Sequence, residues 1–148
     1  MTDHIPYILY LKNMPLLGWA ILVACLFLAD RIIGGRSKVK LLDLGLHSNY
    51  LGYRKFSVSF DSKCNLKSHR IEYHLQNTDD PKVVIAGKSR SMSTSEKGKN
   101  RETLLINKKL IKPGKWLLVV EVIQDRHPLN PFYSLCPVTN KITKEFHL

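Results

Sequence analysis

The stretch from Met14 to Ile33 constrains this chain most, because it carries no charged residue from Met14 to Ala29. As a helix it would be roughly 30 Å long, about the thickness of the hydrocarbon core of a bilayer. Pro15 suits the first turn of such a helix, and Gly34 and Gly35 suit its end. The sequence therefore predicts one transmembrane helix over residues 14–33, after an interfacial segment over residues 1–13.

The residues that flank this run bear on its orientation. Basic side chains are denser after the run, which favours a cytoplasmic position for the rest of the chain. Cysteine usage favours the opposite side, because Cys64 and Cys136 form a lone pair typical of one disulfide in an oxidising compartment. We expect a single-pass protein of the inner (plasma) membrane with a periplasmic C-terminal domain, and cytoplasmic placement stays as the alternative. The linker, residues 34–39, and its surroundings supply the predicted contacts with lipid headgroups: Arg31, Arg36, Lys38 and Lys40.

Cys25 allows a second interpretation of the apolar stretch. The residues Leu22-Val23-Ala24-Cys25 resemble the cleavage box of bacterial lipoproteins, in which the cysteine becomes the lipidated first residue. Leu26-Phe27-Leu28 continues the apolar run, whereas a mature lipoprotein usually turns polar there. A lipoprotein processed at Cys25 therefore stays as an alternative to the transmembrane helix.

Residues 40–148 are predicted to form one all-β domain. Apolar and polar residues alternate in several short segments, as in strands with one buried face. Trp116–Ile123 is apolar on both faces, which predicts a central strand. The turn residues of 77–81 separate two of the segments. The predicted strands cover 40–46, 56–60, 71–75, 83–85, 104–106, 116–123 and 141–147.

One segment carries a resemblance to a known family of folds. Leu110–Val122, with its Pro113-Gly114 turn and Trp116, resembles the turn and sixth strand of immunoglobulin-like and fibronectin type III-like sandwiches. The resemblance implies a small immunoglobulin-like β-sandwich, and a small β-barrel is the alternative. No cysteine lies in 116–123, so the inter-sheet disulfide of immunoglobulin domains is absent.

The sequence lacks the common motifs of catalysis, nucleotide binding and metal binding. It contains no hydrolase elbow, phosphate-binding loop, dinucleotide fingerprint or zinc signature. We therefore expect no catalytic activity, no cofactor and no metal site.

Charge indicates which partners the domain could bind. The chain has a net charge of +11, and residues 1–33 contribute none of it because their charges cancel. The basic residues are densest in 88–101, which lacks obvious core residues and is predicted to be a mobile loop. We expect no nucleic-acid partner, because no aromatic residue interleaves the basic ones. Prolines and two aromatic rings in 127–133 predict a rigid loop. The interaction candidates are Lys88, Arg90, Lys97, Lys99 and Arg101 in the first segment, and Phe132 and Tyr133 in the second.

These features favour a non-catalytic accessory or assembly subunit of a bacterial or phage-encoded envelope complex. Its partners would be membrane lipids and another membrane or envelope protein, with association of copies through the anchor as an option. A cytosolic sensor that binds an anionic ligand such as a nucleotide is the alternative from a different class.

Overall fold

In the computed structural model of the chain, residues 15–34, 38–124 and 130–148 are described. The chain divides into two compact units, Met1–Arg36 and Ser37–Leu148. The predicted interfacial segment and Arg36 lie outside the described residues. The linker is described only at Gly34, Lys38 and Val39, and Val39 already belongs to the first strand.

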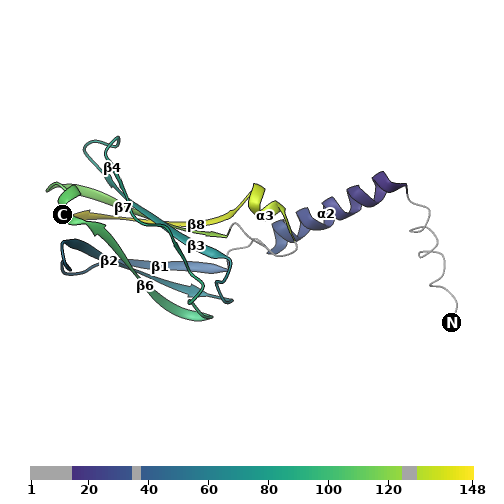
Figure 1. Cartoon of the computed structure of the whole chain (residues 1–148), viewed down its shortest axis with the longest axis horizontal. Coiled ribbons are helices and arrows are strands. Elements are labelled where there is room, and N and C mark those ends of the chain that lie inside the picture. Colours follow the sequence, from purple (N-terminus) through teal and green to yellow (C-terminus); the bar gives the residue numbers. More distant parts are fainter. Residues whose placement is uncertain (1–14, 35–37, 125–129) are drawn as a thin grey trace. The chain divides into compact units, whose positions relative to one another are not determined.

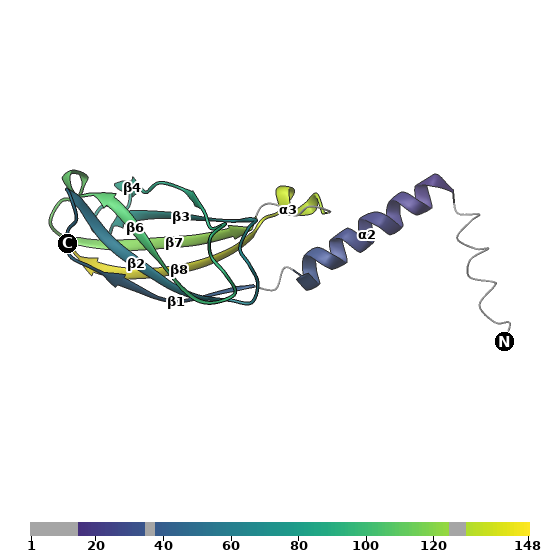
Figure 2. The ribbon, with the colours of Figure 1, turned by 60° about the horizontal axis from the view of Figure 1, so that its bottom comes forward.

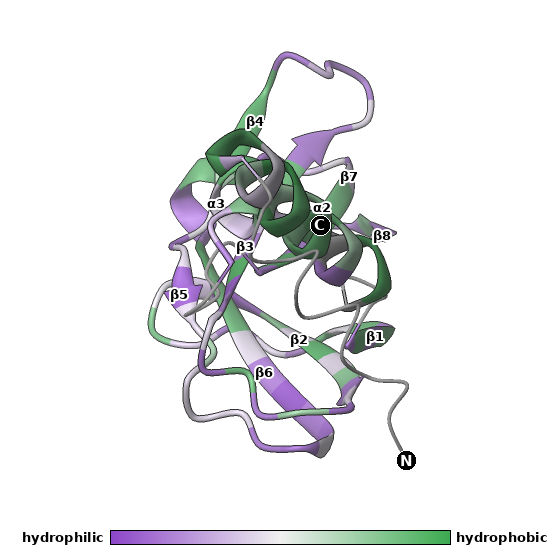
Figure 3. Ribbon diagram, turned by 90° about the vertical axis from the view of Figure 1, so that its right-hand side faces the viewer, coloured by the Kyte–Doolittle hydropathy of each residue, from purple (hydrophilic) through white to green (hydrophobic). Residues whose placement is uncertain are grey.

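The first unit contains the helix α2 (Leu16–Gly34), which has 19 residues. The carbonyl of Pro15 accepts the first helical hydrogen bond from Gly18 N at 2.7 Å. The predicted end of the helix at the glycines is confirmed, because α2 ends at Gly34. Most of α2 is coloured as hydrophobic in Figure 3.

The predicted membrane span is wrong. Within the described residues, no helix is both long enough and apolar enough to cross a membrane. The physical reason lies at the two ends of α2, which begins at Leu16 and carries Asp30 and Arg31 directly after Ala29. The uncharged part of the helix spans only about 21 Å, against roughly 30 Å of hydrocarbon. The prediction of a single-pass inner-membrane protein with a periplasmic domain is therefore not supported.

The second unit consists of two antiparallel sheets (Figures 1 and 2). The first sheet has three strands in the order β1-β2-β6. The second has the order β4-β3-β7-β8, and the short strand β5 also pairs with β3. The bounds are β1 Val39–Leu46, β2 Tyr53–Ser62, β3 His69–Asn77, β4 Val84–Ala86, β5 Arg90–Ser91, β6 Gly98–Asn107, β7 Lys115–Gln124 and β8 Val138–His147, with η1 over Lys108–Leu110 and α3 over Phe132–Leu135.

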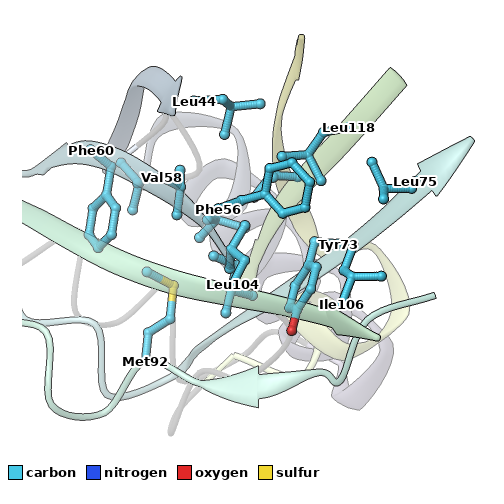
Figure 4. Packing of buried hydrophobic residues seen from close by; sticks show 14 of the residues in the cluster. Leu44, Phe56, Val58, Phe60, Tyr73, Leu75, Met92, Leu104, Ile106 and Leu118 are labelled. Atoms are coloured by element: carbon cyan, nitrogen blue, oxygen red, sulfur yellow. The ribbon is translucent and has the colours of Figure 1, made fainter. Parts of the chain in front are cut away.

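The hydrophobic core fills the space between the two sheets (Figure 4). Alternate residues of β2 and β3 point into it, as the pleat of a strand requires. Phe56, Val58 and Phe60 enter from β2, and Ile71, Tyr73 and Leu75 enter from β3. The predicted all-β sandwich is confirmed, and the barrel alternative is wrong because two separate sheets form. The immunoglobulin-like or fibronectin type III-like assignment stays a prediction, which this strand order favours.

The turn that carried the resemblance has a defined role in the fold. Gly114 has φ of 147°, a conformation that favours glycine. Trp116, two residues later, is fully buried and donates from Nε1 to the carbonyl of Lys112 at 2.8 Å. The predicted central strand is confirmed, because β7 lies between β3 and β8 and is buried on both faces.

Lys144 of β8 contacts β1 and so links the edge strands of the two sheets. Its Nζ donates to Asp43 Oδ1 at 2.8 Å and to the carbonyl of Leu44 at 2.7 Å. The ammonium also lies 5.9 Å from the ring centroid of Phe146. These contacts cover part of the exposed edge of β1, which would otherwise be available for pairing with another chain.

The Lys144 contact predicts an unusual titration of Asp43. The hydrogen bond from Lys144, followed by the backbone hydrogen bond at Leu44, lowers the pKa of Asp43 below 3.8. A carboxylate with a lowered folded-state pKa stabilises the fold above its unfolded pKa and loses that contribution as the pH falls through the folded value. In a carboxyl NMR titration, we expect an Asp43 midpoint below 3.8 that rises towards 3.8 in Lys144→Met. An unchanged midpoint in Lys144→Met would contradict the assignment.

Candidate interaction surfaces

The basic segment 88–101 is more ordered than the sequence predicted. It contains β5 and the first residues of β6, and Met92 within it is part of the core. The carbonyl of Ser95 accepts from Leu66 N at 3.2 Å, and the side chain of Asn65 accepts from Lys97 N at 3.2 Å. The prediction of a mobile loop without core residues is therefore wrong.

The five basic candidates of this segment do not form one surface. Arg90 donates to the carbonyl of Thr103 and lies 3.9 Å from Glu102 Oε2, at the edge between β5 and β6. Lys99 and Arg101 lie on the outer face of β6, where Arg101 Nε is 3.5 Å from Ser59 Oγ. Lys40, predicted to contact lipid, is in register with Asp61, which is in register with Lys99. The other two candidates of the segment, Lys88 and Lys97, are exposed. Lys38, also predicted to contact lipid, is half-buried.

The second predicted interaction segment is only partly described, because residues 127–129 lie outside the described ranges. Pro131 begins the short helix α3, and the side-chain oxygen of Asn130 accepts from Phe132 N at 3.0 Å. Tyr133 is buried and Phe132 is half-buried. The ring of Tyr133 is thus packed inside the unit and is not presented to a partner.

The structure contains thiols where a disulfide was predicted. Cys64 and Cys136 are not bonded to each other in it. Cys64 follows β2 of the first sheet, whereas Cys136 lies between α3 and β8 of the second. Cys25, the alternative lipidation site, lies within α2 and is exposed.

The described residues offer little for catalysis or metal binding. Among them, no three His, Cys, Asp or Glu side chains come together to hold a metal ion. The nearest arrangement to a nucleophile and its base is His47 Nε2, which is 2.9 Å from Ser57 Oγ. Ser57 of β2 is buried, so its hydroxyl is not open to a substrate.

A polar hollow of about 250 Å³ lies beside the start of β3. Its lining includes Lys67, Arg70 and Arg90, together with three serines, and no carboxylate. Glu72 lies 3.1 Å from Arg70, and Glu102 lies near Arg90, so both guanidinium groups already have anionic neighbours. These carboxylates reduce the attraction of the hollow for an anion.

The hairpin between β1 and β2 was not predicted from the sequence. Tyr50 and Tyr53 exchange two backbone hydrogen bonds, of 2.9 and 2.8 Å, around Leu51 and Gly52. The leucine is the only non-glycine residue with positive φ among those described, at 45°. The available signal was the Leu-Gly pair between two aromatic residues at the start of an alternating strand.

Taken together, these features define a small β-sandwich module preceded by a helix whose apolar side chains are exposed. A family model described as LydB, LydA-holin antagonist, matches residues 16–148, and the chain belongs to this family. None of the curated proteins compared with the chain matches it.

Family membership bears directly on the functional predictions. It indicates a phage-related accessory role associated with a holin, which is the coarse form of the predicted function. The match covers both α2 and the sandwich. The nucleotide-sensor and lipoprotein alternatives receive no support from this family.

Proposed function

We propose that this chain is a non-catalytic antagonist that binds a holin through α2. The observation that carries the proposal is the exposure of the apolar side chains of α2, which ranges from 37% at Leu22 to 90% at Leu16. A helix that is apolar on every face is normally covered by other apolar surface. Full burial of one such side chain contributes about 1.5–3 kcal/mol, so a few of them suffice for a stable complex.

The holin is the partner that the family description supports. An apolar segment of a holin offers the kind of surface that α2 lacks within its own unit. A holin covered by α2 would have less apolar surface available for association with other holin copies. Antagonism then follows from competition for one surface and needs neither a reaction nor a cofactor.

Charge supports this role at longer range. The net charge of +11 favours approach to anionic surfaces, and such attraction raises association rates more than it raises affinity. We propose Lys88, Arg90, Lys97, Lys99 and Arg101 as electrostatic contacts, with Lys38 and Lys40 as further candidates. Their contribution would decrease with increasing salt because exposed charges are screened.

Charged residues placed in α2 should abolish antagonism. Ile21 and Leu28 are exposed and lie two helical turns apart on one side of α2. Ile21→Glu/Leu28→Glu keeps good helix formers but would put two carboxylates into the contact. When LydA holin is co-expressed with this variant, we expect lysis as early as with the holin alone, whereas the unmodified chain delays it. Culture turbidity and dye entry give the lysis time.

Ile21→Ala/Leu28→Ala is the matched control, because it shortens the same side chains without adding charge. It should weaken pull-down of the holin and shorten the delay, but less than the glutamate variant does, because it puts no carboxylate into the apolar contact. A full delay by the glutamate variant, at equal protein level and with unchanged circular dichroism, would refute the proposal that α2 binds the holin.

A further inference from the structure

The apex of the β1–β2 hairpin holds an apolar residue in a conformation that suits it poorly. Leu51 and Gly52 have φ of 45° and 82°, the positive values that a two-residue type I′ turn requires. Asn, Asp and Gly are preferred at the first position, and a β-carbon in the left-handed region is sterically unfavourable. Leu51 is nevertheless 80% exposed, so packing within the unit does not compensate for this strain. A strained, exposed leucine indicates a contact outside the chain.

The side chains around the apex extend this apolar surface. Tyr50 and Tyr53 flank Leu51 and are both exposed, as is Leu110 of η1. A hydrogen bond from Lys108 N to the carbonyl of Gly52, of 3.0 Å, fixes η1 beside the turn. The apex is therefore built from two segments that are far apart in the sequence.

Basic residues accompany the apolar apex, without carboxylates on the same segments. Residues 44–58 and 103–120 contain no Asp or Glu, but they include Arg54, Lys55, Lys108 and Lys109. Arg54 donates to the side chain of Asn49, and none of the three lysines has an ion pair within the described part of the chain. Asp79 lies beside Gly114, in the turn before β7 of the other sheet.

We infer that this apex binds the surface of an anionic phospholipid bilayer. The apex combines exposed Leu51 at the turn, two exposed tyrosines beside it, and Lys108 and Lys109 on the adjoining η1. A bilayer surface offers a matching partner to each: acyl chains for leucine, the interface for tyrosine, and phosphate groups for lysine. A convex turn can reach this layer from one side and needs no spanning segment. The inference is independent of the proposed binding of α2 to a holin.

Leu51→Asn separates this role from a structural one. Asn-Gly is the preferred type I′ pair, so the variant should have a higher thermal midpoint than its parent. Binding to phosphatidylcholine vesicles that contain phosphatidylglycerol should weaken about tenfold or more, because an apolar contact is lost. Vesicle flotation of the full chain measures it. All variants carry Ile21→Glu/Leu28→Glu, which limits binding of vesicles by α2.

The controls define the outcomes. Leu135→Asn makes the same change at another exposed leucine and should leave flotation unchanged. Lys108→Gln/Lys109→Gln should weaken binding and reduce its salt dependence, and vesicles of phosphatidylcholine alone should bind poorly. Equal flotation of Leu51→Asn and its parent would overturn the inference. An absence of flotation of the parent would also overturn it. If Leu51→Asn alone then lost antagonism, the result would indicate a protein partner at the apex.

Discussion

Replacing Trp116 with alanine is expected to lower the free energy of unfolding of the sandwich by about 3–5 kcal/mol. The indole is fully buried between the sheets, and its Nε1 satisfies the carbonyl of Lys112 at 2.8 Å. The substitution would leave a large cavity and an unpaired carbonyl at the Pro113-Gly114 turn. Because domains are stable by only about 5–15 kcal/mol, a substantial part of the stability would be lost.

Urea unfolding followed by far-ultraviolet circular dichroism measures this effect without relying on the removed fluorophore. Trp116→Phe is the matched control, since it keeps an aromatic ring but removes the Nε1 donor. We expect it to cost about 1–2 kcal/mol, mainly through the lost hydrogen bond. A cost below 1 kcal/mol for Trp116→Ala would contradict the central packing role of the indole.

Gly87→Ala is expected to destabilise the sandwich by about 1–3 kcal/mol through overpacking. A β-carbon at Gly87 would overlap the ring of Tyr73. This ring cannot move freely, because its hydroxyl donates to the carbonyl of Leu105 at 3.0 Å and accepts from Leu105 N at 3.3 Å. The substitution would therefore disturb the core and the edge of β6 together.

A double-mutant cycle with Tyr73→Leu tests this explanation. Once the ring is absent, Gly87→Ala should cost much less than it does in the unmodified chain, which gives a coupling of about 1–2 kcal/mol. Equal costs of Gly87→Ala in both backgrounds would show that Tyr73 is not the obstacle. Chemical denaturation of the four proteins provides the measurement.

The strands of the sandwich could be predicted because their signal is local. Phe56, Val58 and Phe60 alternate with serines, and all three enter the core as this alternation predicts. The alternation in Ile71, Tyr73 and Leu75 gives the same result. Glycine and proline at 113–114 marked the turn before β7, where Trp116 is buried.

The errors arose where a local pattern did not carry the deciding contact. The polar segment 88–101 reads as a loop, but the ladder between β2 and β6 extends as far as the pair Ser62 and Gly98. Met92, a single apolar residue among serines and basic residues, reaches the core only because this segment packs against residues 65–69. The helix at residues 16–34 was correctly located, but its charged residues and its start at Leu16 exclude the predicted span.

The sequence by itself determined the elements of this protein: an apolar helix, then strands with one or two buried faces, and a strongly basic balance of charge. Only the tertiary structure decided how the edges and the surface are completed. Lys144 reaches Leu44 across 100 positions, and Tyr73 reaches Leu105 across 32. The hairpin apex likewise acquires its lysines from a distant segment. Periodicity reports which face of an element is buried, whereas contacts between distant residues depend on the register and packing of the whole fold.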